Sequence, residues 1–175
     1  MLFLAQISPA MFQRLSIIVL SVATVAAVSC KKSPETVTYA GTNLPLNAAQ
    51  VAPTPAVASP ATGTLNASYD NTTRTMSYTV TWSNTTDSVT AIRIQGPADG
   101  GYNGAILQSF ANSTTSNTPP RRKSGSFSQS LAVDNVVVKE TELLAGLYYV
   151  TVYTKASAAY PTGELRGQLT FQRSN

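Results

Sequence analysis

Residues 65–82 read LNASYDNTTRTMSYTVTW, and this stretch decides the fold class. Apolar and polar residues alternate on both sides of a turn-forming segment, DNTTR, at residues 70–74. Period-two alternation around a turn is typical of a β-hairpin that buries one face. We therefore predict two antiparallel strands, and the buried positions are Leu65, Ala67, Tyr69, Met76, Tyr78, Val80 and Trp82.

Other short β-prone segments lie on both sides of this hairpin, separated by turn-forming residues. Three prolines within residues 47–61 remove backbone donors, so we expect a loop or an extended edge segment there. Residues 136–145 favour the one short helix, which Gly146 is placed to end. The remaining predicted strands span residues 38–46, 89–94, 105–110, 124–133, 147–154 and 164–172.

About seven or eight strands of this kind predict an all-β domain. We expect an antiparallel immunoglobulin-like β-sandwich or a Greek-key barrel over residues 38–173. The composition agrees, because only 11% of the 175 residues are charged and Ser, Thr and Asn supply most of the polarity. Such side chains suit exposed strands and turns better than helix surfaces.

The first thirty residues have the features of an export signal. Residues 17–28 read IIVLSVATVAAV, with Arg14 just upstream, and this run is too short to span a bilayer. The following Ala27-Val28-Ser29-Cys30 resembles the lipobox of bacterial lipoproteins, although Leu is commoner at the position of Ala27. We therefore predict a signal peptide at 1–30, with translation starting at Met1 or Met11.

Cys30 is the only cysteine of the chain, so it cannot form an internal disulfide. We predict that it carries lipid, including a palmitate-type acyl chain, and that residues 31–37 form a tether. Each buried CH₂ of an acyl chain contributes about 0.8 kcal/mol to membrane binding. The alternative is an ordinary signal peptide that is cleaved near Ala27. The expected location is the cell envelope, on the outer membrane or at a periplasmic or extracellular face.

Three later segments point to a family. They read IQGPA at residues 94–98, YYVTVYT at 148–154 and YPTGELRGQL at 160–169. Together they resemble the chordin-type (CHRD) domain family over about residues 36–173, and the PTGELRGQ ending is the most specific part. The resemblance implies an immunoglobulin-like or barrel-like β fold. Members occur as repeats in chordin and as lone domains in bacterial exported proteins, where most have no assigned activity.

The chain departs from this family in having no histidine. The family commonly carries His-Ile-His before Gly-Pro and another His in the late strand, where this chain has Arg93, Gln95 and Tyr153. Arginine stays protonated, and an amide and a phenol are poor metal ligands at neutral pH. We therefore expect no metal and no cofactor, and histidine-dependent catalytic arrangements are excluded.

Glu164 and Arg166 stand two residues apart on a predicted strand, so their side chains share a face. We expect them to form a structural ion pair. The alternative is a polar cluster that binds an anion or serves an enzyme without metal. Its members would be Arg93, Gln95, Tyr153, Glu164 and Arg166.

Recognition residues are expected in the loops. Tyr102 lies in a glycine-rich loop, and Arg121, Arg122 and Lys123 form a basic run that is too short to indicate nucleic acid. The leading hypothesis is an exported, lipid-anchored, non-enzymatic binding or structural module of the bacterial cell envelope, with a protein or glycan partner. The alternatives are the enzyme just described and an envelope assembly subunit.

Overall fold

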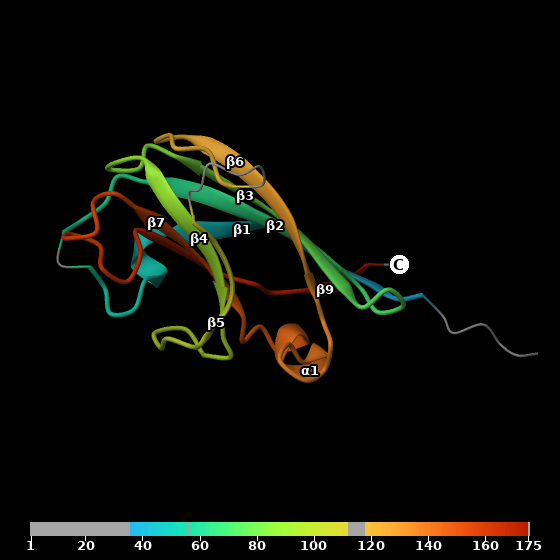
Figure 1. The fold of residues 1–175 in the computed structure, drawn as a ribbon. Coiled ribbons are helices and arrows are strands. Elements are labelled where there is room, and N and C mark those ends of the chain that lie inside the picture. The colour runs from blue at the N-terminus through green and yellow to red at the C-terminus, as the bar shows by residue number, and fades with distance from the viewer. Residues whose placement is uncertain (1–35, 56, 112–117, 175) are drawn as a thin grey trace, which may run out of the picture. The chain divides into compact units, whose positions relative to one another are not determined.

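The computed structural model describes residues 36–55, 57–111 and 118–174. The predicted signal peptide, Cys30 and most of the tether lie outside these residues. The described residues belong to one compact unit, shown in Figure 1. Its elements are β1 (Thr38–Asn47), the 3₁₀-helix η2 (Ala48–Gln50), β2 (Thr62–Asp70), β3 (Thr75–Ser83), β4 (Val89–Gln95), β5 (Ile106–Ala111), β6 (Gly125–Ala132), α1 (Glu140–Leu144), β7 (Tyr149–Thr154), β8 (Leu165–Gln168) and β9 (Gln172–Ser174).

The predicted hairpin is confirmed as β2 and β3, which pair antiparallel with Leu65 opposite Val80. All seven of its predicted core positions are at most 8% exposed. The turn is closed by Asp70, whose carboxylate accepts hydrogen bonds from the amides of Thr72 and Thr73 at 2.7 and 3.0 Å. The alternation in the sequence thus sets which face of this hairpin is buried.

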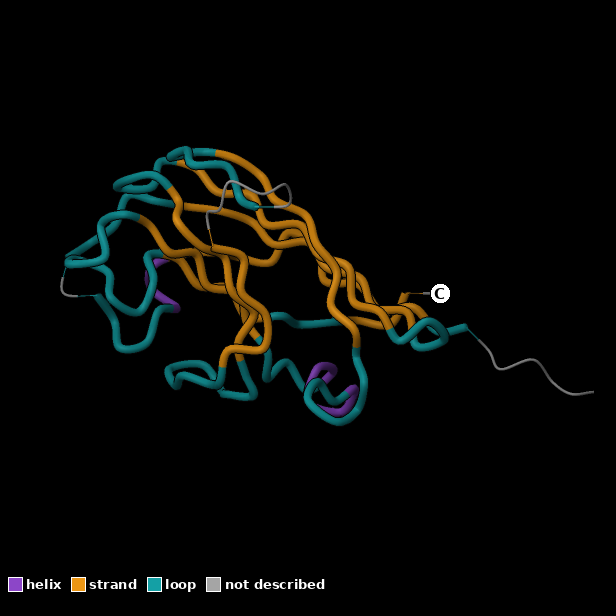
Figure 2. The backbone as a smooth tube through the Cα atoms, viewed as in Figure 1, coloured by secondary structure: helices purple, strands orange, loops and turns teal. Residues whose placement is uncertain are grey.

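The strands form one antiparallel sheet in the order β5-β4-β7-β8-β1-β2-β3-β6, with β9 paired to β1. The sheet folds over, so that one half of four strands and one half of five, which includes β9, enclose the core (Figure 2). The halves are joined through β8 and β1, which share the single register pair Asn47–Arg166. This arrangement lies between the predicted sandwich and the predicted barrel, and the all-β class is confirmed.

Side chains connect the two free edges of the sheet, β5 and β6. The Tyr78 hydroxyl donates to Gln108 of β5 at 2.8 Å, and the Gln108 amide donates to the Ser130 carbonyl of β6 at 2.9 Å. Phe110 and Phe127 meet edge to face at 5.2 Å between ring centroids. Burial raises the pKa of Tyr78 well above its ordinary value. Because these contacts join β5 to β6, the sheet is nearly closed.

The prediction of one continuous strand over residues 164–172 is wrong. It is divided into β8, which pairs with β7, and β9, which pairs with β1. Between them Leu169 leaves the ladder and is fully buried in the core. The chain therefore passes from one half of the sheet to the other, which accounts for nine strands where seven or eight were expected.

The hairpin core gives a direct stability prediction. Leu65→Ala removes a side chain that is 0% exposed, so the free energy of unfolding should fall by about 3 kcal/mol. The matched control is Thr64→Ala, which changes the exposed neighbour on the same strand and should cost less than about 0.5 kcal/mol. Equilibrium urea unfolding measures both values, and equal losses would contradict the assigned faces.

Candidate functional site

The candidate site lies on the outer face of the half-sheet formed by β4, β7 and β8. Arg93, Thr151 and Arg166 stand side by side across these strands. Their alternate neighbours point into the core, as expected for a strand. Thr151 and Arg166 are nevertheless only 1% and 2% exposed, because loops cover this outer face. The covered face also carries Gln95, Tyr149, Tyr153 and Gln168.

The three positions where the family commonly has histidine come together. The Arg93 guanidinium carbon lies 4.3 Å from the centre of the Tyr153 ring, and the Tyr153 hydroxyl donates to Gln95 at 3.3 Å. The buried Nε atom of Arg93 has no hydrogen-bond partner. A cation–π stack and an amide therefore occupy these positions. Across the described ranges, no group of three or more Cys, Asp and Glu side chains is arranged to hold a metal ion.

Glu164 and Arg166 do not form the predicted ion pair. The Glu164 carboxylate is 0% exposed and accepts hydrogen bonds at 2.7 Å each from the Ser59 hydroxyl, the Thr86 amide and the Thr154 hydroxyl. It therefore joins the loop before β2, the loop before β4 and the end of β7. Each carboxylate oxygen has a donor, so the charge is stabilised without a cation.

Arg166 points to the other end of β7. Its guanidinium carbon lies 3.5 Å from the centre of the Tyr149 ring, whereas Glu164 contacts Thr154 at the last residue of that strand. Five residue steps along a strand span roughly 16 Å, which separates the two charges. Spacing in the sequence placed both side chains on one face, but it did not reveal their separate partners.

The partners of the Arg166 guanidinium are neutral. It donates to the Tyr102 carbonyl at 2.7 Å, to the Asp99 carbonyl at 3.3 Å and to the Gln168 side chain at 3.2 Å. Within the described part of the chain, no carboxylate lies within ion-pair distance of it. Burial lowers the pKa of Arg166, yet arginine remains charged in proteins. The result is a buried cation without a counter-ion.

Arg166 and its neighbours on the sheet hold the β4–β5 loop in place. The Gln168 amide donates to the Ala98 carbonyl at 3.0 Å, and the Tyr149 hydroxyl accepts from the Gly104 amide at 2.8 Å. Asn103 then donates to Ala52 at 2.6 Å and connects this loop to the β1–β2 loop. Arg166 and Gln168 of the PTGELRGQ segment, together with Tyr149 and Asn103, thus fix these loops.

A cleft of about 480 Å³ opens where these two loops meet over Arg166. Arg166 and Gln168 line it from the sheet, Gly100 and Gly101 from the β4–β5 loop, and residues 49–54 from the β1–β2 loop. Gly101 has a φ of +91°, a left-handed conformation that favours glycine. Sequence reasoning identified Arg166 but not this cleft, because its walls come from distant loops.

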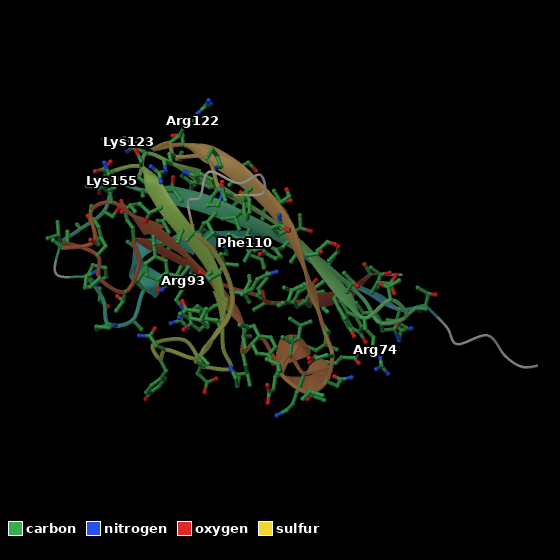
Figure 3. The ribbon with its side chains drawn as sticks, in the orientation of Figure 1. Arg74, Arg93, Phe110, Arg122, Lys123 and Lys155 are labelled. Atoms are coloured by element: carbon green, nitrogen blue, oxygen red, sulfur yellow. The ribbon has the colours of Figure 1, made fainter. Side chains whose placement is uncertain are left out.

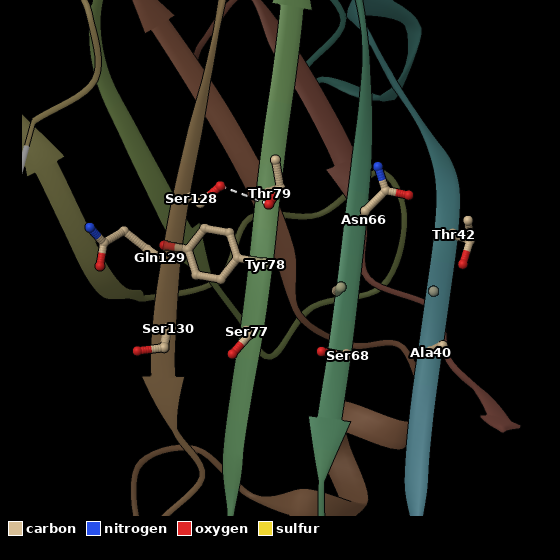
Figure 4. A pocket seen from close by; sticks show the side chains of 12 residues that line it. Ala40, Thr42, Asn66, Ser68, Ser77, Tyr78, Thr79, Ser128, Gln129 and Ser130 are labelled. Atoms are coloured by element: carbon tan, nitrogen blue, oxygen red, sulfur yellow. Dashed lines mark hydrogen bonds between the residues drawn. The ribbon is translucent and has the colours of Figure 1, made fainter. Parts of the chain in front are cut away.

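A second hollow, of about 610 Å³, lies on the opposite half-sheet (Figure 4). Its exposed lining consists of short polar side chains on β1, β2, β3 and β6, and none of its residues is charged. Thr79 and Ser128 hydrogen-bond across it at 2.8 Å. These side chains offer hydroxyl and amide groups but no ionised acid or base.

The predicted recognition residues fall into two separate places. Tyr102 is 71% exposed on the loop held by Arg166. Arg121, Arg122 and Lys123 are exposed elsewhere. There the Lys123 carbonyl accepts the Thr85 amide, and the Arg122 carbonyl accepts the amide of Val89, the first residue of β4. The structure therefore does not unite Tyr102 with the basic run.

Lys155 joins the basic run at this end of the molecule (Figure 3). Its amide bonds to Ser88 at 3.0 Å, and its side chain lines a small hollow with Arg121. We call Arg121, Arg122, Lys123 and Lys155 the basic end. Among the described residues its cations form no ion pair. Sequence reasoning missed Lys155 because it lies far from the others along the chain.

The comparisons assign the family. The CHRD domain model matches residues 42–169, which is well over half of the chain, so the chain belongs to this family. No curated protein and no solved structure matches it significantly. No helix in the described ranges is long and apolar enough to cross a membrane.

The role of Glu164 can be tested with Glu164→Gln. The amide leaves one acceptor oxygen for three donors, so the free energy of unfolding should fall by about 2 kcal/mol. Asp99→Asn is the control, because Asp99 is exposed and the change should cost less than about 0.5 kcal/mol. Urea unfolding gives both values. An unchanged free energy of unfolding in Glu164→Gln would contradict the assigned hydrogen-bond network.

Proposed function

We propose that this member of the CHRD domain family is a non-enzymatic binding module, exported and held at the bacterial cell envelope by lipid on Cys30. The observation that carries the binding role is the basic end, where four exposed cations gather without an acidic partner among the described residues. The lipid anchor rests on the Ala27-Val28-Ser29-Cys30 motif after an apolar segment of signal-peptide length.

The position of the basic end supports a role facing away from the membrane. The described chain enters the sheet beside the β2–β3 turn, since Thr38 pairs with Asp70. The basic end lies at the other end of this hairpin, where the Asn84 amide donates to Ser124. Nine-residue strands separate these ends by roughly 25 Å. A tether at residues 31–37 would therefore leave the basic end accessible from outside.

The expected partner is an acidic protein or glycan. Exposed arginine and lysine side chains attract such partners through long-range charge complementarity. Asp87 is the acidic residue in the adjoining loop, and its carboxylate accepts the Ser88 amide at 2.6 Å. The Glu164 carboxylate is buried beneath the same loop and accepts the Thr86 amide. The four cations of the basic end therefore outnumber these two acids.

The enzyme alternative has less support. A carboxylate that works as an acid, base or nucleophile must reach a substrate, whereas the Glu164 carboxylate is fully buried and bonded to three donors. An assembly subunit would need a contiguous apolar patch or an open edge strand. Side chains of β5 and β6 connect the two outer edges of the sheet. The large apolar side chains that are exposed in the described residues are few and divide among three stretches of the chain: Val57, then Tyr102 and Ile106, then Val136 and Val137.

One experiment tests both halves of the proposal. Three tagged full-length proteins are compared by cell fractionation, intact mass and crosslinking pull-down. They are the unaltered chain, Cys30→Ala, and the triple variant Arg121→Gln/Arg122→Gln/Lys123→Gln. We expect the unaltered chain in the membrane fraction, with the added mass of diacylglyceryl and acyl groups, and Cys30→Ala in the soluble fraction. The triple variant should stay in the membrane and recover on the order of tenfold less acidic partner.

The matched control for charge is Arg74→Gln, since Arg74 lies at the far end of the domain from the basic end (Figure 3). This variant should recover the partner as the unaltered chain does. An unmodified Cys30 mass would contradict the lipid anchor. Equal partner recovery by the triple variant would contradict recognition at the basic end and leave the anchor untouched.

A further inference from the structure

We propose that the cleft over Arg166 is a second binding site, and that it takes a small molecule bearing one carboxylate group. This site is separate from the basic end and does not depend on the lipid anchor. The cleft volume of about 480 Å³ falls within the range of about 300–1,000 Å³ that small-molecule sites occupy.

The charge of Arg166 is the first argument. Its side chain is 2% exposed and lines the cleft, and its partners in the described chain are carbonyls, an amide and an aromatic ring. A buried charge is stabilised most by an opposite charge at hydrogen-bonding distance. The cleft lets a ligand supply that charge from solvent.

Free donors are the second argument. A guanidinium has five N–H groups, and the three hydrogen bonds of Arg166 leave two without a described acceptor. At the cleft wall, the amides of Gly100 and Gly101 make no backbone hydrogen bond within the described chain. Successive backbone amides in a turn can bind an anion. Arginine and amide donors thus line the same cleft.

The ligand class follows from charge and shape. Arg166 contributes one positive charge, and the exposed Asp99 lies on the adjoining loop. A monoanion balances this site better than a dianion such as phosphate. A carboxylate also matches the planar arrangement of guanidinium donors. Val51, Ala52 and Pro53 offer an apolar wall for the rest of the molecule.

The test varies the charge at the mouth of the cleft without changing Arg166. A side chain at Gly100 meets no atom within 4 Å, so Gly100→Asp should fold and place a carboxylate beside the site. Gly100→Asn is its neutral counterpart of the same shape. Asp99→Asn removes the natural carboxylate. Full-length chain in detergent is titrated by calorimetry with glucuronate, with glucose as the neutral probe, and with inorganic phosphate.

We expect glucuronate to bind and glucose not to bind. Gly100→Asp should weaken glucuronate binding about tenfold, Gly100→Asn should leave it unchanged, and Asp99→Asn should tighten it about threefold. The basic-end triple variant should bind glucuronate normally, which separates this site from the proposed function. No binding, equal binding of glucose, tighter binding of phosphate, or an unaffected Gly100→Asp variant would each overturn the proposal.

Discussion

The structure depends on the separate burial of two opposite charges, those of Glu164 and Arg166. Glu164 is stabilised by hydroxyl and amide donors, and Arg166 by carbonyl oxygens and the Tyr149 ring. A buried charge of this kind is tolerated only where its hydrogen-bond partners are fixed. Each charge therefore fixes the loops that surround it, and these loops form both the cleft and the ends of the domain.

Much of the fold could be predicted from the sequence, because alternation determines which strand face is buried. The β2–β3 hairpin follows from that period. The family resemblance singled out Arg93 and Tyr153, and the pairing of β4 with β7 brings them into contact. The partners of Glu164 could not be predicted, because Ser59, Thr86 and Thr154 come from three distant segments. Lys155 and the cleft were missed for the same reason, since only the folded chain brings their neighbours together.

The two proposed recognition surfaces, the basic end and the cleft over Arg166, differ in exposure and in charge. The basic end is exposed and suits a large acidic partner, whose attraction acts over distance. The cleft has a volume of about 480 Å³ and its cation is buried, so that it suits a small ligand with one charge. The residues at the family's histidine positions lie beside this cleft on the same sheet face. In this chain they form a cation–π stack and a hydrogen bond with one another.

Amide hydrogen exchange, followed by mass spectrometry, tests most directly whether the two charges act separately. In Arg166→Lys, the account predicts faster exchange in residues 98–104, whose loop Arg166 holds, and unchanged exchange in residues 85–89. In Glu164→Gln it predicts the reverse, because Glu164 binds the Thr86 amide. If both variants accelerated exchange in both loops equally, the two residues would act as one unit, and the account would be contradicted.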